Sequence, residues 1–153
     1  MRFLTVILCA FSFAITVGCA SGPAYSAAAP RASTDLALIY IYRMPEFAGF
    51  FGGPHIYVQE RKYGSLVSDG FFVAEVKPGE LEIYARSHKY WEPPSQSIKL
   101  DAKAGEKYYI RYGLNLVKYE PYFLQFEYGS NLALMKTDVG LKEISDRNLI
   151  SPD

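Results

Sequence analysis

Short apolar runs, each broken by turn-forming residues, recur along most of the chain and constrain its fold more than any other feature. From Asp35 onward, Gly, Pro, Asn or Asp interrupts the apolar runs. An interruption about every ten residues is typical of strands joined by turns and leaves no room for the helices of a βαβ fold. The aromatic content, 13 Tyr and 10 Phe in 153 residues, also favours sheets, where rings pack on the pleated surface. The sequence therefore predicts an all-β domain.

Two segments indicate which residues face the core. Residues 36–43 (LALIYIYR) are apolar at nearly every position, as expected of a central strand covered on both faces. Residues 80–87 (ELEIYARS) alternate instead, so one set should face the core and the other should face solvent. The inward set is Leu81, Ile83 and Ala85, and the outward set is Glu82, Tyr84 and Arg86.

Turn residues divide the rest of the domain into further strands. These are predicted in HIYVQE, YGSLV, GFFVAEV, SIKLDA, EKYYIRY, YFLQFEY and NLALMK. HIYVQE and YGSLV flank a polar turn around Arg61 and Lys62, which predicts a hairpin. Pro78-Gly79 predicts a tight reversal between GFFVAEV and ELEIYARS. Three more glycines are predicted at turns or bulges: Gly64, Gly105 and Gly113.

Only residues 137–148 (TDVGLKEISDRN) have a helical spacing. Asp138 is a candidate cap for this helix, and Leu141 and Ile144 would form its apolar face. Together these patterns predict a two-sheet antiparallel β-sandwich of about seven or eight strands, with one short C-terminal helix. The folded domain should span residues 35–150.

The N-terminal segment is predicted to be a signal peptide. Residues 3–17 carry no charge and follow Met1-Arg2, and from Gly18 onward the residues are small or polar. A positive start before an apolar run of this length is typical of secretion, because a membrane-spanning helix needs roughly 20 apolar residues. An uncleaved, tilted anchor helix is the alternative. We expect residues 1–18 to be removed.

The next residues, TVGCASG, resemble the lipobox of bacterial lipoproteins, in which small or aliphatic residues precede a cysteine. One departure is Thr16, where leucine is usual. The resemblance implies that Cys19 is lipidated and becomes the first residue of the mature protein, with acyl chains such as palmitate anchoring it in the membrane. By the sorting rule of such lipoproteins, Ala20 implies the outer membrane of a Gram-negative bacterium, on its periplasmic face.

Cleavage at this cysteine would also determine the thiol chemistry of the mature chain. Cys9 would leave with the signal peptide, so no thiol would remain for a disulfide, a metal site or a nucleophile. Residues 20–34 are rich in Ala, Ser and Pro and carry a single charge. They are predicted to form a flexible tether that holds the domain roughly 20 Å from the membrane.

Three segments resemble a family of small bacterial lipoproteins known as domain of unknown function 2846. They are ALIYIYR, IYVQERKYGSLVSDGFFVAEVKPGELEIYA and AGEKYYIRYG, within residues 35–113. The middle segment is also similar to transthyretin-like or PEGA-like surface modules. The resemblance implies a β-sandwich on a lipid anchor, and it supplies no catalytic residue.

Little in the sequence indicates catalysis or a cofactor. Acidic and basic residues balance at 16 each, so the net charge favours no nucleic acid partner. His55 and His88 lack a second His or Cys at metal-ligand spacing. Neither a Gly-x-Ser-x-Gly elbow nor a phosphate-binding glycine loop is present. We therefore expect a non-enzymatic protein without a metal or cofactor.

An aromatic loop at residues 86–94 (RSHKYWEPP) is a candidate binding site. A sugar or peptide could stack on Tyr90 and Trp91, while Arg86 or Glu92 supplies hydrogen bonds. The alternative is structural, with Trp91 folding back to plug the end of the sandwich.

A second aromatic loop, residues 44–54, contains Phe50 among other phenylalanines and glycines. Its rings either close the core or dock a partner or lipid. The overall expectation is a membrane-anchored periplasmic module that binds or scaffolds an envelope protein or glycan. The alternative is a glycan- or peptide-binding module that uses the loops around Phe50 and Trp91.

Overall fold

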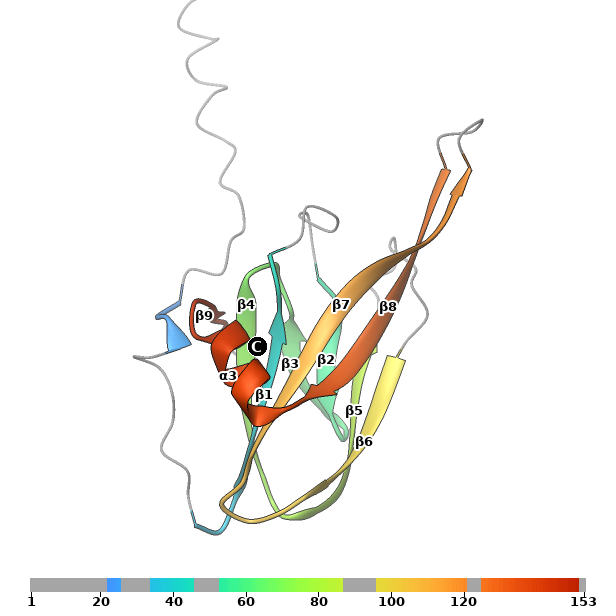
Figure 1. The fold of residues 1–153 in the computed structure, drawn as a ribbon. Coiled ribbons are helices and arrows are strands. Elements are labelled where there is room, and N and C mark those ends of the chain that lie inside the picture. Colours follow the sequence, from blue (N-terminus) through green and yellow to red (C-terminus); the bar gives the residue numbers. More distant parts are fainter. Residues whose placement is uncertain (1–21, 26–33, 46–52, 87–95, 121–124, 152–153) are drawn as a thin grey trace, which may run out of the picture.

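Two β-sheets pack face to face in the computed structural model, which describes residues 22–25, 34–45, 53–86, 96–120 and 125–151 (Figure 1). The strands are β1 (Ala37–Arg43), β2 (His55–Val58), β3 (Arg61–Ser65), β4 (Gly70–Val76), β5 (Gly79–Arg86), β6 (Gln96–Ala102), β7 (Lys107–Glu120), β8 (Gln125–Met135) and β9 (Asn148–Leu149). One sheet has five strands in the order β8-β7-β1-β4-β9, and the other has four in the order β3-β2-β5-β6. The predicted two-sheet sandwich is confirmed.

Strand β1 lies in the middle of the five-stranded sheet and is buried on both faces, as predicted. One face contributes to the core between the sheets, and the other belongs to a second core on the outer side. The residues of the first face are Ala37, Ile39 and Ile41, and those of the second are Leu38, Tyr40 and Tyr42. A strand with apolar residues at successive positions needs a cover on both sides, and the fold supplies both.

The core between the sheets uses the alternation predicted for β5. Leu81, Ile83 and Ala85 are buried, whereas Glu82 and Arg86 are exposed. The same core contains Ile56, Phe72, Leu100, Ile110 and Tyr112 from the neighbouring strands. Burial of this apolar surface is the main favourable contribution to folding.

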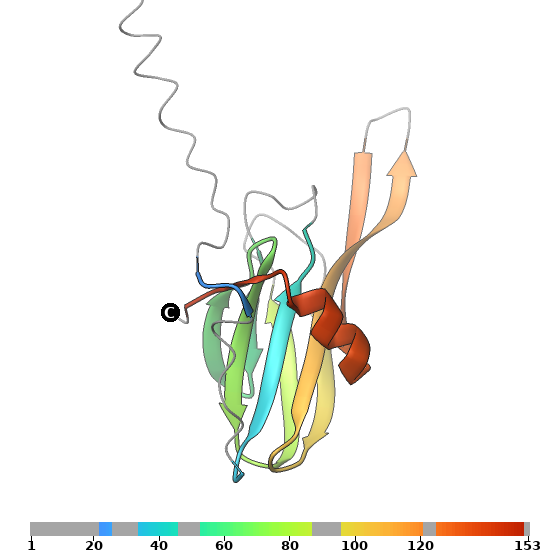
Figure 2. The same cartoon turned by 60° about the vertical axis from the view of Figure 1, so that its left-hand side comes forward.

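The second core lies under helix α3 (Thr137–Ile144), which covers the outer face of the five-stranded sheet (Figure 2). Its members are Tyr25, Leu38, Tyr40, Tyr42, Phe71, Tyr109 and Ile144. The rings of Tyr40 and Tyr109 stack with centroids 5.1 Å apart. Gly140 lets the helix approach β7, because a Cβ atom at this position would lie 2.3 Å from the Cβ of Tyr109.

A helix is confirmed in the predicted segment, but it ends at Ile144 instead of Asn148, which begins β9, and two further details were wrong. The residue before the first turn is Lys136, without a side-chain cap, while Asp138 lies inside the first turn. Leu141 is 44 % exposed, and only Ile144 of the predicted apolar pair is buried. Gly140 and Ile144 form the face that contacts the sheet, because four residues make about one helical turn.

Two strand pairs are parallel, although the prediction was a wholly antiparallel sandwich. β1 pairs with β7 in parallel, and β4 pairs with β9 in parallel. Between β1 and β7 the chain passes through both sheets, so β7 returns beside β1 in the same direction. Apolar alternation reports which face of a strand is buried, but it carries no information about strand direction.

Glycines with positive φ occur where the chain bends, and most of the predicted turns are confirmed. The β2–β3 hairpin turns at Gln59, two residues before the predicted position, and Gly64 (φ 114°) lies at a bulge opposite Ile56. Gly105 has a φ of 75° in the turn before β7. Gly113, in contrast, is paired in register with Asn131 within β7, so the turn or bulge predicted there was wrong.

Pro78-Gly79 connects the two sheets, at the position where a tight reversal between two strands was predicted. β4 pairs with β1 in the five-stranded sheet, while β5 pairs with β2 and β6 in the four-stranded sheet. Gly79 has a φ of 129° and already belongs to β5. The Pro-Gly signal predicted the change of direction correctly, but it could not tell which strands would pair afterwards.

Strands β7 and β8 form a long two-stranded ribbon that extends past the body of the sandwich (Figure 1). β1 accompanies β7 only as far as Tyr112, and beyond that position β7 pairs with β8 alone among the described strands. The two strands predicted in YFLQFEY and NLALMK are one continuous strand, β8, within the described residues.

Residues 22–25 pack against the domain, although they lie within the segment predicted to be a flexible tether. Ala24 forms a bridge with Asn148, and Tyr25 belongs to the second core. The folded unit therefore includes residues N-terminal to the predicted domain start at Asp35.

Candidate functional site

Of the predicted ligand-contact residues, only Arg86 lies within the described part of the chain. It is the last residue of β5, and its side chain is exposed. Tyr90, Trp91, Glu92 and Phe50 lie outside the described residues, as does Cys19.

Arg86 covers a pair of stacked tyrosines on the outer face of the four-stranded sheet. Tyr57 of β2 and Tyr84 of β5 are directly opposite each other in the register, and their rings stack with centroids 4.8 Å apart at 7°. The Arg86 guanidinium carbon lies 5.2 Å from the Tyr57 centroid and 5.1 Å from the Tyr84 centroid. Both distances are within the range of cation–π attraction.

The neighbouring row of the same outer face adds polar groups. His55 is opposite both Arg86 on β5 and Ser65 on β3, and Ser65 Oγ lies 3.0 Å from His55 Nδ1, within hydrogen-bonding distance. Lys62 is opposite Tyr57. We call this surface the tyrosine–arginine face. It consists of His55, Tyr57, Lys62, Ser65, Tyr84 and Arg86.

Regular strand geometry places these residues together. In β2 and β5 the residues between them, such as Ile56 and Ala85, are buried in the core, so the alternate positions face outward. The sequence had predicted that Tyr84 and Arg86 share an outward face. It did not identify Tyr57 or His55 as their neighbours, because that requires knowing that β2 pairs with β5.

The tyrosine–arginine face carries groups that can bind a ligand. Tyrosine rings offer apolar surface to a sugar ring or an aromatic group, and their hydroxyls can hydrogen-bond. The Arg86 guanidinium can donate to a carboxylate, sulfate or phosphate. A serine–histidine pair such as Ser65 and His55 becomes a nucleophile only with an orienting group for the histidine and donors for the oxyanion.

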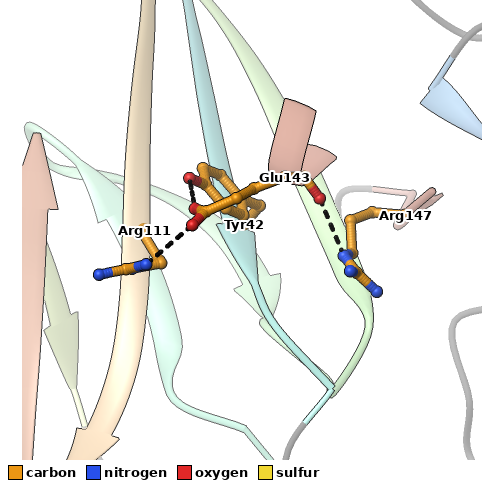
Figure 3. A network of polar contacts seen from close by, with 4 residues as sticks. All are labelled: Tyr42, Arg111, Glu143 and Arg147. Carbon is orange, nitrogen blue, oxygen red and sulfur yellow. Dashed lines mark hydrogen bonds and ion pairs between the residues drawn. The ribbon is translucent and has the colours of Figure 1, made fainter. Parts of the chain in front are cut away.

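A second polar cluster joins α3 to the five-stranded sheet (Figure 3). The Tyr42 hydroxyl donates a hydrogen bond of 2.5 Å to Glu143 Oε2, and Arg111 Nη1 donates one of 2.9 Å to Glu143 Oε1. Arg147 Nε donates to the Glu143 carbonyl oxygen over 3.1 Å. Both carboxylate oxygens of Glu143 are thus engaged in holding the helix.

Burial is the largest cause that raises the pKa of Tyr42 above its ordinary value, and the hydrogen bond to Glu143 raises it further. The neutral hydroxyl is therefore retained as the donor to the carboxylate. Because the contacts of Tyr42, Arg111 and Glu143 connect β1, β7 and α3, this cluster has a structural role in the fold.

A hollow of about 300 Å³ lies at one end of the sandwich. It is lined by the β2–β3 hairpin and by the connection between β4 and β5, and its charged lining residues are Arg61, Glu75, Lys77 and Glu80. Arg61 lies 4.9 Å from the centroid of the Tyr63 ring. Because the lining carries two cations and two carboxylates, it favours neither an anionic nor a cationic ligand.

Neither a metal-binding cluster nor a membrane-spanning helix occurs in the described ranges. No three His, Cys, Asp or Glu side chains in these ranges converge as a metal site requires. No helix among the described residues is long and apolar enough to cross a bilayer.

The family profile described as protein of unknown function, DUF2846, matches residues 33–123. The match covers more than half of the 153 residues. The chain belongs to this family. No curated protein and no solved structure matches the chain. The DUF2846 match includes every residue of the tyrosine–arginine face, whereas residues 22–25, α3 and β9 lie outside it.

Proposed function

We propose that this DUF2846 protein is a non-enzymatic lipoprotein, anchored through Cys19 in the outer membrane, that binds another component of the periplasm through its tyrosine–arginine face. The observation that carries the binding role is the stacked pair Tyr57 and Tyr84 under an exposed Arg86. Exposed aromatic and arginine side chains are enriched where proteins bind partners. The anchoring rests on the apolar run and lipobox that precede Ala20.

A glycan- or peptide-binding module is the more specific version of this function. The Tyr57–Tyr84 pair provides a stacking surface, and Arg86 provides a donor for a carboxylate of a glycan or peptide. Arg86 also directly precedes the segment that contains Tyr90 and Trp91, so the loop proposed from the sequence and the face could act on one ligand.

The anchoring is tested by fractionation and mass spectrometry of the protein in cells. Lipidation predicts a mature N-terminus at Cys19 that carries acyl chains, and it predicts that a Cys19→Ala variant is released in soluble form. A Cys19→Ala variant that stays in the membrane would contradict this anchoring.

The binding role is tested by the retention of the mature protein on isolated peptidoglycan and by titration with its soluble fragments. We expect Tyr57→Ala and Arg86→Ala each to weaken binding roughly tenfold, which corresponds to about 1.4 kcal/mol. Lys103→Ala, which changes an exposed cation in the β6–β7 turn, is the matched control and should bind like the wild type. Equal retention of all variants would exclude the tyrosine–arginine face as the binding surface for this ligand.

A further inference from the structure

Residues 22–25 lie at the edge of the five-stranded sheet, where Ala24 forms a single antiparallel bridge with Asn148 (Figure 2). The Tyr25 amide donates to the Arg147 carbonyl over 3.0 Å, and the Leu149 amide donates to the Pro23 carbonyl over 2.9 Å. Leu149 itself belongs to β9, which pairs with β4 on its other side. The N-terminal segment therefore lies beside β9, on the side away from β4.

Tyr25 anchors the segment through its side chain. It is only 9 % exposed, and its ring makes edge-on contacts with Tyr40 and Phe71 at centroid distances of 5.4 and 5.9 Å. Its hydroxyl lies 3.3 Å from that of Tyr109. Burial of a tyrosine in such an aromatic cluster is a specific attachment, since the ring contributes both apolar area and directional contacts.

Gly22 specifies the other end of the segment. A Cβ atom at this position would lie 1.9 Å from the carbonyl oxygen of Leu149, so any side chain would force the backbone away from β9. The segment is thus held at one end by a glycine packed against the backbone of β9 and at the other by a tyrosine buried in the second core.

The distance from this attachment to Cys19 is short. Only Ala20 and Ser21 lie between Cys19 and Gly22, and the three Cα-to-Cα steps that join the two residues span at most about 11 Å in an extended chain. A free coil over residues 20–34 would instead place the domain roughly 20 Å from the anchor on average.

We propose that residues 22–25 are a clip that holds the domain directly against the lipid surface, with the β9 edge of the five-stranded sheet facing the membrane. The inference rests on the proposed lipidation of Cys19. Because the clip belongs to the five-stranded sheet, the tyrosine–arginine face lies on the opposite layer of the sandwich and stays open to the periplasm.

The proposal is tested on the lipidated mature protein in vesicles of phosphatidylethanolamine and phosphatidylglycerol. With Cys9 removed and Cys19 acylated, a single introduced cysteine can carry a fluorescent donor, and a lipid headgroup dye serves as the acceptor. The two donor positions are Ser151→Cys beside β9 and Ser97→Cys, which is opposite Tyr84 on the outer layer. We expect stronger energy transfer from position 151 than from position 97.

Substitutions within residues 22–25 test the clip while the lipid anchor stays unchanged. Tyr25→Ser and Gly22→Val should lower the transfer from position 151 by about half, because the released segment behaves as a coil with a mean extension of roughly 20 Å. Ala24→Ser, an exposed change within the same segment, is the matched control and should leave the transfer unchanged. Equal transfer from both positions, or no effect of Tyr25→Ser, would overturn the proposal.

Hydrogen exchange keeps this result distinct from a failure of the proposed lipidation. If mass spectrometry finds no acyl chains and the protein leaves the vesicles, the anchoring is refuted. The clip is then tested by the exchange rates of the backbone amides that hold it. The amides of Tyr25 and Leu149 should be protected in the wild type and exchange faster in Tyr25→Ser. Unprotected amides in the wild-type protein would refute the clip whether or not Cys19 is lipidated.

Discussion

Replacing Gly140 by alanine should destabilise this protein, although alanine is the better helix former. In an exposed helix interior, the change from glycine to alanine gains about 0.8–1 kcal/mol. Gly140 is buried in α3, and a Cβ atom there would lie 2.3 Å from the Cβ and 2.5 Å from the Cγ of Tyr109. Carbon atoms in contact normally lie about 3.5–4.0 Å apart, so either the helix or β7 would have to move by more than an ångström.

The magnitude follows from what such a movement disturbs. Overpacking of a core costs about 1–3 kcal/mol. A shift of α3 would also stretch the hydrogen bonds that Glu143 accepts from Tyr42 and Arg111, and bonds to charged groups each contribute about 1.5–3 kcal/mol. After the gain in helix propensity is subtracted, we expect the free energy of unfolding to fall by about 2–3 kcal/mol.

Urea denaturation of the mature chain carrying Cys19→Ala, followed by circular dichroism, measures this loss. The midpoint should fall without a change in the slope, since the surface exposed on unfolding is the same. Lys142→Ala, at an exposed position of the same helix, is the control and should stay within about 0.5 kcal/mol of the wild type. A Gly140→Ala variant as stable as the wild type would show that α3 does not pack on Tyr109 in this way.

Two further predictions concern pH and the joint between the sheets. Burial is the main cause that raises the pKa values of Tyr40, Tyr42 and Tyr109. The folded state therefore favours their neutral forms. The free energy of unfolding should stay constant below a pH of about 10, which is the pKa of tyrosine in an unfolded chain, and it should fall above that pH. The ultraviolet absorbance of tyrosinate should show these three residues ionising only as the circular dichroism signal is lost, and earlier ionisation of all 13 tyrosines would contradict their burial. Gly79→Ala should lower stability in urea by about 1–2 kcal/mol, because its φ of 129° strains any other residue although the space is open. Gly113→Ala should lower stability less than Gly79→Ala, because the φ of Gly113 is not positive and the atom nearest to a Cβ there is the terminal side-chain oxygen of Asn131. A larger loss for Gly113→Ala than for Gly79→Ala would refute the argument from φ.

The sequence predicted the elements of this fold well where burial follows a simple period. Strict alternation in ELEIYARS placed three residues of β5 in the core, and the run LALIYIYR predicted a strand buried on both faces. Local turn chemistry was also informative, since Gly64, Gly79 and Gly105 all have positive φ. Each of these signals depends on a few neighbouring residues, and such short-range information is present in any single sequence.

What the sequence could not supply was the pairing of distant segments. Tyr57 and Tyr84 form one face only because β2 lies beside β5, and no residue pattern in either strand indicates which strand it will pair with. The same limit explains the parallel β1–β7 pair and the Pro78-Gly79 joint between sheets. For the candidate site, alternation gave Tyr84 and Arg86 as outward residues, but the fold was needed to add His55 and Tyr57.

The second core shows why the folded unit extends past the residues matched by the family. β1 carries apolar residues on both faces, so the five-stranded sheet requires a cover on the side away from its partner sheet. That cover is assembled from both ends of the chain, with Tyr25 from one and Ile144 and Leu149 from the other, and none of these three lies within residues 33–123. A chain that began at Ser33 would keep the whole matched region and still leave Tyr40 and Phe71 without the ring of Tyr25. The segment that completes this core is also the one next to Cys19. If Cys19 carries the lipid, the contacts that orient the domain at the membrane are therefore contacts that stabilise its fold, and a substitution that frees the clip should weaken both.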